Sequence, residues 1–467
     1  MMGLMASDET RTETMRSTTP GEATARDARV PGEAPGAPGT RAWTTWTTRL
    51  LLLGIVLAAL NLRPAITSLG ALLEEVRDGL GMSGSVAGLL TSVPPLCFAV
   101  FGVTAPRLAR RFGPGAVVCA GMVAITAGLL IRPYAGGTAG FLAATALALM
   151  GIAVSNVLMP VIVKRFFPDR VGSMTGLYSM ALAFGTSIAA AATVPMTNAL
   201  GGDWQPGLAV WAVVAAAAVL PWIPFVRERR APSTLTPAPD PSDEALEADE
   251  ATGKPATARP ADRQAKQPAE QPPLRITRSR TAWALAVFFG LQATAAYITM
   301  GWMAQIFRDA GVSAGTAGLL LAVIMVMGVP LAFVIPRVAT RLPHQGPIVL
   351  VLGVCGLAGY AGLYFAPAGG AWAWALLLGV SNCAFPLALT MVGMRARTGA
   401  GVAQLSAFAQ STGYLISIPG PLLVGVLYQH SGGWGLPIAL MSALMVPQMV
   451  VGFLAGRDRT VEEEAAR

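Results

Sequence analysis

The chain has 467 residues, of which 54% are hydrophobic and 12% are charged, with a net charge of +8 and a mean hydropathy of +0.56. An average soluble domain carries about 25% charged residues, so this composition excludes a disordered, fibrous or disulfide-rich chain. Only 20 of the 58 charged residues lie within the two long blocks 50–226 and 281–456. A soluble protein could not cover its surface with so few charges, and the sequence therefore predicts an integral membrane protein.

Three polar segments flank and separate these blocks. Residues 1–42, rich in Thr, Ala, Gly, Pro, Arg and Glu, are predicted to form a disordered cytoplasmic tail, and 229–275 a disordered cytoplasmic linker. Residues 457–467 are predicted to be a second cytoplasmic tail. The domains expected between them are an N-terminal six-helix bundle over 43–228 and a C-terminal one over 276–456.

Each block contains six apolar stretches that reach the roughly 20 residues needed to cross a bilayer as a helix. The predicted spans are 50–72, 84–106, 114–132, 138–162, 172–196, 207–226, 281–303, 314–336, 346–366, 371–394, 401–427 and 434–455. A membrane-spanning chain of this pattern is all-α, because helices satisfy their own backbone hydrogen bonds inside lipid.

The short loops distribute their basic residues unequally. Numbered from a cytoplasmic N-terminus, the inner loops hold ten Lys and Arg residues and the outer loops hold three, namely Arg77, Arg132 and Arg308. Basic residues beside spans mark the cytoplasmic side. We therefore expect a multi-pass protein of the inner or plasma membrane with both termini in the cytoplasm, and no role in nucleic-acid binding.

The two halves are related by an internal repeat. Residues 81–111 align without gaps on 311–341, with 11 of 31 positions identical, and Val154-Ser155-Asn156 is echoed by Val380-Ser381-Asn382. Because each half has six helices, the repeats share one membrane orientation and predict two parallel, pseudo-symmetric bundles. Many secondary transporters have this plan, with the solute site between the halves near the middle of the membrane.

Arg63 is the exception to the apolar spans. It lies roughly 21 Å along the helix from Arg49 and roughly 16 Å from Glu74, at ~1.5 Å per residue, and therefore near the midplane. A guanidinium there costs about 2.5–3.5 kcal/mol on insertion scales, and all 25 acidic residues lie in loops, tails or helix ends. Arg63 therefore faces backbone carbonyls, a water-filled cavity or a bound anion, and Pro64 indicates an interrupted helix at this point.

Several uncharged polar residues in the spans are further candidates for solute binding. Buried amides in a span need partners, so each either bonds a neighbouring helix or lines the central cavity. The predicted substrate-binding residues are Arg63, Asn61, Asn156, Gln292, Tyr297 and Asn382, and weaker candidates are Gln404, Gln410 and Tyr414.

Signatures of catalysis are missing from the sequence. The only Gly-Lys pair, Gly253-Lys254, is followed by Pro255 and lies in the linker, and no His-x-x-x-His pair or acidic cluster falls in a span. The four cysteines lie in apolar runs without CxxC spacing. We therefore expect no enzyme, no catalytic residue, no cofactor and no metal.

Two motifs resemble those of a known superfamily. Pro106-Arg107-Leu108-Ala109-Arg110-Arg111-Phe112-Gly113 resembles the loop between helices two and three of the major facilitator superfamily, although its acidic residue and first glycine are missing. The resemblance covers about 50–455, and implies the major facilitator fold and a role for this loop in gating. The gating residues that it implies are Arg107, Arg111, Arg337 and Arg341.

The run Asn61-Leu62-Arg63-Pro64-Ala65-Ile66-Thr67-Ser68 more specifically resembles the cyanate/nitroimidazole transporter family of that superfamily. This resemblance implies a secondary active or facilitative transporter of a small solute, such as the anion cyanate or a related polar compound, that works by alternating access. A multidrug or nitroimidazole-type exporter of the same fold is the alternative. The expected partners are a small anionic or polar solute and the lipid bilayer, and the expected state is a monomer.

Overall fold

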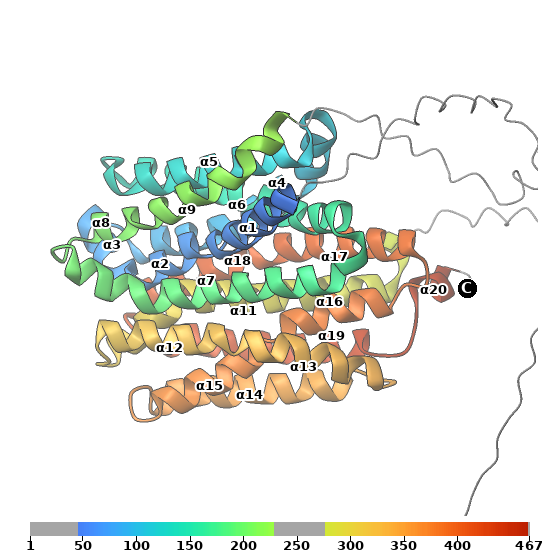
Figure 1. Ribbon diagram of the computed structural model, residues 1–467. Helices are drawn as coiled ribbons and strands as arrows, with labels where there is room; N and C mark the ends of the chain where they lie inside the picture. The colour runs from blue at the N-terminus through green and yellow to red at the C-terminus, as the bar shows by residue number, and fades with distance from the viewer. Residues whose placement is uncertain (1–44, 228–275, 466–467) are drawn as a thin grey trace, which may run out of the picture. The chain divides into compact units, whose positions relative to one another are not determined.

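The computed structural model describes residues 45–227 and 276–465, and these residues form helices without any strand (Figure 1). The predicted N-terminal tail and the linker fall outside the described residues. Contacts group the described residues from Trp46 onward into one compact unit. Twelve helical segments in the described part are long and apolar enough to cross a membrane, which confirms the predicted six spans in each half.

The described part of the N-terminal half contains nine α-helices and three 3-10 segments, and all of them except α3 and the 3-10 turn Pro168–Arg170 contribute to the first six spans. Their bounds are α1 (Thr45–Asn61), α2 (Pro64–Ala71), α3 (Leu73–Leu80), α4 (Gly84–Phe112), α5 (Pro114–Ile131), α6 (Thr138–Phe166), α7 (Val171–Ala199), α8 (Trp204–Ala209) and α9 (Trp211–Val219), the last continuing into a 3-10 segment, Leu220–Arg227.

The C-terminal half contains the other six spans and one short terminal helix. Their bounds are α11 (Arg280–Asp309), α12 (Ala314–Val326), α13 (Gly328–Arg341), α14 (Gly346–Phe365), α15 (Ala371–Ser381), α16 (Ala384–Met394), α17 (Gly399–Ser417), α18 (Pro419–Ser431), α19 (Gly435–Ala455) and α20 (Val461–Ala465).

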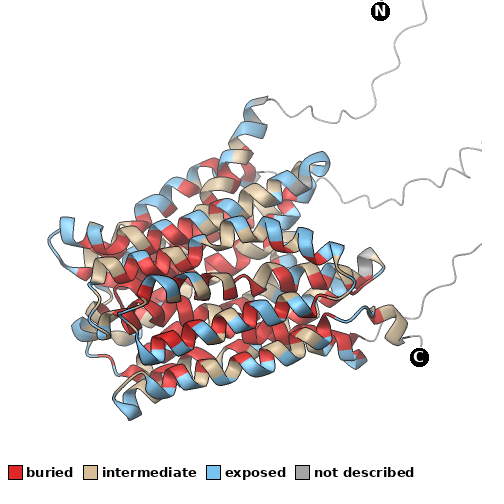
Figure 2. Ribbon diagram, turned by 90° about the horizontal axis from the view of Figure 1, so that it is seen from below, coloured by how far each residue is buried: buried red, intermediate tan, exposed pale blue. Residues whose placement is uncertain are grey.

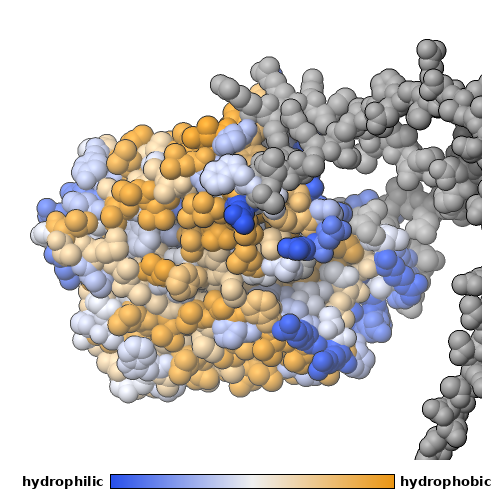
Figure 3. Space-filling view, in the orientation of Figure 1, coloured by the Kyte–Doolittle hydropathy of each residue, from blue (hydrophilic) through white to orange (hydrophobic). Residues whose placement is uncertain are grey.

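Apolar side chains cover the outside of the helices over much of their length. Figure 3 shows hydrophobic residues across the middle of the face in view and hydrophilic residues gathered toward the two ends of the helices. Figure 2 shows buried and exposed residues alternating along single helices, as expected when one side of each faces the protein and the other faces lipid. The structure therefore has the surface of a bilayer-spanning bundle.

Helix α11 is the most enclosed of the twelve spans in the described part, since 72% of its most apolar 18-residue stretch is buried inside the protein. It packs on α17 and α19 in its own half and on α2 and α4 in the other half. Trp302, Phe307 and Phe288 on this helix are among the largest fully buried side chains. Side chains on α11 are therefore placed to contact both halves, which is why its polar residues matter for the site.

Small residues bring the two halves together at one end of the bundle, where α3 and the last turn of α11 lie. A Cβ atom built on Gly70 would lie 2.0 Å from the carbonyl oxygen of Met300, and one on Gly84 would lie 2.9 Å from that of Gly425. Helix α12 approaches α7 in the same way, since a Cβ on Gly318 would lie 2.6 Å from the Ala190 carbonyl oxygen. Glycine permits this close backbone contact between membrane helices.

Two segments differ from the expectations. Arg132, predicted to lie in an outer loop, is 1% exposed and packed inside the N-terminal half, because its side chain turns back to hydrogen-bond α2. Residues 457–465, predicted to be a tail, carry the short helix α20. Glu464 on α20 accepts hydrogen bonds from Ser279 and Thr281 at the start of α11.

Candidate functional site

The first span is broken where Arg63 lies. Helix α1 ends at Asn61, α2 begins at Pro64, and Arg63 occupies the N-cap position between them with φ −123° and ψ −25°. Pro64 has no N–H to donate to the carbonyl of Leu60, so the helical hydrogen-bond ladder stops here. The Arg63 carbonyl accepts bonds from Ile66 and Thr67 and starts the new helix. The predicted interrupted helix is therefore present.

The Arg63 side chain crosses toward the other half of the protein. Its Nη1 atom lies 3.8 Å from the sulfur of Met300 on α11. The residue is only partly buried, and none of the ion pairs among the described residues includes it. A cation with a polarisable but uncharged neighbour retains most of its capacity to bind an anion.

Three tyrosines surround this guanidinium. Tyr178 on α7, Tyr297 on α11 and Tyr414 on α17 all lie close enough to Arg63 to interact with it electrostatically, and the Tyr297 side chain also hydrogen-bonds with it. The Tyr178 hydroxyl donates to Oδ1 of Asn156 on α6. The guanidinium of Arg63 donates only, and the hydroxyls of Tyr297 and Tyr414 can donate as well, so groups from both halves converge on a place suited to an acceptor.

Aromatic rings form one wall beside these hydroxyls. The rings of Phe98 and Tyr414 are stacked with their centroids 5.1 Å apart, and Phe289 meets Tyr414 edge-on at 5.2 Å. Phe385 on α16 extends this contact, with its centroid 5.9 Å from that of Phe289. The wall is apolar, and its rings meet both face to face and edge to face, as aromatic pairs prefer.

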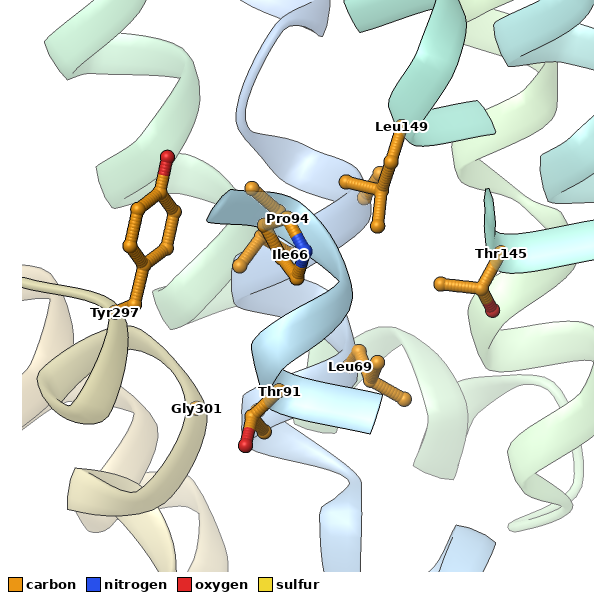
Figure 4. A pocket seen from close by; sticks show the side chains of 10 residues that line it. Ile66, Leu69, Thr91, Pro94, Thr145, Leu149, Tyr297 and Gly301 are labelled. Atoms are coloured by element: carbon orange, nitrogen blue, oxygen red, sulfur yellow. The ribbon is translucent and has the colours of Figure 1, made fainter. Parts of the chain in front are cut away.

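A small cavity of about 10 Å³ adjoins the site (Figure 4). Figure 4 shows Tyr297 on α11 on one side of Ile66 and Pro94, with Thr145 and Leu149 of α6 on the other. A space of this size holds about one water molecule. The Thr145 hydroxyl is buried and has no hydrogen-bond partner in the described structure, so it is a natural partner for such a water.

The other predicted binding residues have different surroundings. Asn61 is 1% exposed, and its amide nitrogen donates to the carbonyls of Leu57 and Val214, so it joins α1 to α9. Gln292 is 3% exposed, and its side-chain oxygen has no partner among the described residues. Asn382 is partly buried at the break between α15 and α16. Only Asn156 and Tyr297 of this group are brought to the surroundings of Arg63.

The predicted gating arginines all lie exposed at the end of the bundle that carries α20. The Arg111 guanidinium lies 5.1 Å from the centroid of the Phe112 ring, and Arg337 bonds the Phe333 carbonyl. Arg107 and Arg341 are also exposed. Within 45–227 and 276–465, none of the four forms an ion pair. Their gating role stays a prediction.

Ion pairs join the halves at the opposite end. Nη2 of Arg308, in the last turn of α11, lies 2.8 Å from Oε2 of Glu74, and Nη1 lies 2.9 Å from Oε2 of Glu75. The Ser85 hydroxyl and amide on α4 both donate to Oε1 of Gln429 on α18. Together with the glycine contacts, these bonds close this end of the bundle.

Asp309 anchors the same turn of α11 to its own half. Its carboxylate accepts hydrogen bonds from Gln305, from the Tyr428 hydroxyl at 2.9 Å and from the Trp434 indole at 2.8 Å. The Trp302 indole, whose ring packs against Tyr428 and Trp434, donates to the Thr91 hydroxyl on α4 at 3.1 Å.

Sequence reasoning missed several of these groups. Tyr178, Phe98 and Phe289 lie in apolar spans and look like ordinary lipid-facing or core residues, whereas Tyr414 was only a weak candidate. The pairing of Arg308 with Glu74 joins residues far apart in the sequence. The only sequence feature that pointed to this ion pair was that both residues are charged and lie at the end of a span.

Several known proteins resemble this chain in sequence. The profile described as "Major Facilitator Superfamily" matches residues 51–418. The chain is 32% identical to an uncharacterized transporter, YycB, of Bacillus subtilis (strain 168) over 88% of the chain and 94% of that protein. It is 30% identical to the 2-nitroimidazole transporter of Escherichia coli (strain K12) over 88% of the chain and 96% of that protein.

The cyanate transport protein CynX of Escherichia coli (strain K12) is 28% identical over 86% of the chain and 96% of its own length. Among solved structures, a D-xylose-proton symporter superposes with a TM-score of 0.64 at 13% identity, covering 87% of this chain and 97% of the symporter. The structural likeness confirms the predicted fold of two six-helix halves. The relatives confirm the resemblance seen in the Asn61–Ser68 run, and they are transporters.

Proposed function

The chain belongs to the Major Facilitator Superfamily, and from this premise we propose that it transports a small anion, such as cyanate, gripped by Arg63 between the two halves. The observation that supports this best is a partly exposed guanidinium at a helix break, with phenols from both halves around it and no ion pair among the described residues. A fork of donors suits a small planar or carboxylate-like anion.

The proposed mechanism is alternating access, and contacts at the two ends support it. Arg308 with Glu74, and Gly70 with Met300, close one end of the bundle. At the end that carries α20 the halves meet less tightly, since a Cβ on Gly176 would lie 3.5 Å from the Phe333 ring, an ordinary contact distance. Since Arg63 is partly exposed, we infer that solvent reaches it from the α20 end.

We place the α20 end in the cytoplasm. The basic residues of the inner loops lie at this end, and Arg132 leaves the outer set because it is buried in the bundle. The outer loops then hold only Arg77 and Arg308, which strengthens the charge bias behind the assignment. The described conformation is therefore closed outside, and its Arg63 site communicates with the cytoplasm.

A nitroimidazole-type exporter is the second candidate, and the aromatic wall favours it. Stacked and edge-on rings of Phe98, Tyr414 and Phe289 offer flat apolar surfaces to a planar heterocycle. A relative with 30% identity carries the name 2-nitroimidazole transporter. For such a ligand, ring stacking would contribute more than the charge of Arg63.

Uptake into proteoliposomes separates the two candidates. With labelled cyanate, nitrite and formate, Arg63→Ala should abolish uptake and Arg63→Lys should lose most of it, because an ammonium does not reproduce the fork. Arg49→Ala is the matched control, because this exposed arginine lies at the start of α1, in the same span as Arg63 but away from its middle. Uptake of 2-nitroimidazole that survives Arg63→Ala, together with no uptake of any anion by the native protein, would support the exporter instead.

A further inference from the structure

A second guanidinium lies deep in the N-terminal half, behind the site. Arg132 follows the last residue of α5 and is 1% exposed, more enclosed than Arg63 itself. None of the ion pairs in the described part of the chain includes it. Burying a charge without a counter-ion costs several kcal/mol in a protein interior, so its presence calls for a function.

The partners of Arg132 are both on α2. Nη1 donates to the Ala65 carbonyl at 2.9 Å, and Nη2 donates to the Ser68 hydroxyl at 3.3 Å. Ala65 and Ser68 lie in the first turns of α2, directly after the break that presents Arg63. Arg132 therefore braces the short helix whose N-cap is Arg63.

Bracing alone does not require a charge. A neutral amide side chain can donate to a carbonyl and to a hydroxyl without the cost of burying an ion. Nε of Arg132 is also buried with no hydrogen-bond partner in the described structure, so the donors of the fork are not fully used by protein groups. What a guanidinium adds over an amide is an unscreened positive charge in a low-dielectric interior.

We propose that Arg132 is a positioning residue for the Arg63 site, which fixes the first turn of α2 and adds a second positive charge to the field that holds a small anion. The proposal rests on the anion transport proposed above. Arg63 contacts the anion directly, and Arg132 acts through α2 and through its field. The N-terminal half then brings two guanidiniums and the Tyr178 phenol to the site, and the C-terminal half brings the phenols of Tyr297 and Tyr414.

Two substitutions separate the charge from the hydrogen bond. Arg132→Lys keeps the charge and Arg132→Gln keeps a donor for the Ala65 carbonyl without the charge. In proteoliposomes with labelled cyanate, we expect Arg132→Gln to raise KM about tenfold, or about 1.4 kcal/mol, with Vmax little changed, and Arg132→Lys to stay within about threefold of the native KM. A native KM in Arg132→Gln, or equal KM values in both variants, would overturn the proposal.

Arg395 provides a matched control. It is also 1% exposed and donates to backbone carbonyls, those of Ala455 and Gly456, but it lies at the α20 end of the other half. Arg395→Gln should lower thermal stability and leave the KM for cyanate unchanged. An equal rise in KM for Arg395→Gln would show that loss of any buried arginine disturbs transport, and would refute a specific role for Arg132.

Hydrogen exchange tests the positioning without any substrate. In detergent and without added anion, Arg132→Met, which removes the charge and every donor, should speed exchange at the amides of Ile66 and Thr67 severalfold, whereas Arg132→Gln, Arg132→Lys and Arg395→Gln should not. Ser68→Ala, which removes one partner and keeps the charge, should cause a smaller change of the same kind. Unchanged exchange in Arg132→Met would overturn the positioning role even if transport of cyanate were confirmed, so the two proposals can fail separately.

Discussion

Arg308 on α11 and Glu74 on α3 form an ion pair, with 2.8 Å between Nη2 and Oε2, that joins the two halves of the protein at one end. Glu75 accepts the other Nη atom of the same guanidinium. The contact lies at the end opposite the α20 helix, where the close glycine approaches also occur. Opening this end must separate the guanidinium from both carboxylates.

Loss of this ion pair should favour the state that is open at the Arg308 end. Each partly exposed pair is worth about 0.2–1 kcal/mol, so Arg308→Gln, which removes both pairs, should raise the open fraction roughly two- to thirtyfold. The measurement is the distance between spin labels at Asp78→Cys and His430→Cys, in a background without the four native cysteines. Arg308→Glu combined with Glu74→Arg should restore the native distribution, and an unrestored one would argue against a direct pair.

The phenol of Tyr297 should contribute to anion binding. A hydrogen bond to a charged group contributes about 1.5–3 kcal/mol, so Tyr297→Phe should raise the KM for labelled cyanate by roughly ten- to a hundredfold while the fold stays intact. Tyr360→Phe is the control, because Tyr360 is equally buried on α14 but faces a different cavity, beside Leu291 and Gln448. Equal effects of the two substitutions would remove Tyr297 from the site.

Gly70 should be indispensable for closure at the Arg308 end. A Cβ atom there would lie 2.0 Å from the Met300 carbonyl oxygen, a distance that real Cβ contacts do not reach. Gly70→Ala should therefore reduce transport at least tenfold and shift the spin-label distances toward the open state. Gly315→Ala, at a glycine with open space around it, should leave both unchanged. Normal transport by Gly70→Ala would show that the close approach is not needed.

Docking of α20 should weaken at acidic pH. Burial alone would raise the pKa of Glu464, but hydrogen bonds from Ser279 and Thr281 outweigh it and hold the pKa below its usual value of 4.5. A depressed carboxyl pKa adds stability above the unfolded value, and this contribution is lost as the pH falls through the folded pKa. Protection of the amides at the start of α11 against hydrogen exchange should therefore fall as the pH drops below 4.5, and Glu464→Gln should show the lower protection already at pH 7. Exchange in Glu464→Gln that matches the native protein at pH 7 would contradict this.

The span count and Arg63 could both be predicted from the sequence, for the same physical reason. A bilayer tolerates few charges, so apolar length reveals each span and a single charge within one becomes conspicuous. The break at Pro64 followed equally from the missing N–H. These features depend on local chemistry alone.

Arg132 shows where that reasoning fails. A charged residue at the end of a span has the same local sequence whether it enters the loop or turns back into the bundle. Only the approach of the Ala65 carbonyl on α2 to the Arg132 side chain decides between the two. The same limit applies to Tyr178 and Phe289, because an aromatic residue in an apolar span gives no sign of which neighbour it will meet.

Two consecutive residues in the last turn of α11 bind different halves of the protein. Arg308 is bound to α3 in the opposite half, whereas Asp309 is bound to Tyr428 and Trp434 in its own half. When the halves rock apart, the bonds of Arg308 break together with those between Ser85 and Gln429, whereas the bonds of Asp309 move as a rigid block. Solvent can rehydrate the released charges, so Arg308 carries the charged part of the conformational barrier at this end, and the speed of the carrier can be tuned there without disturbing the Arg63 site.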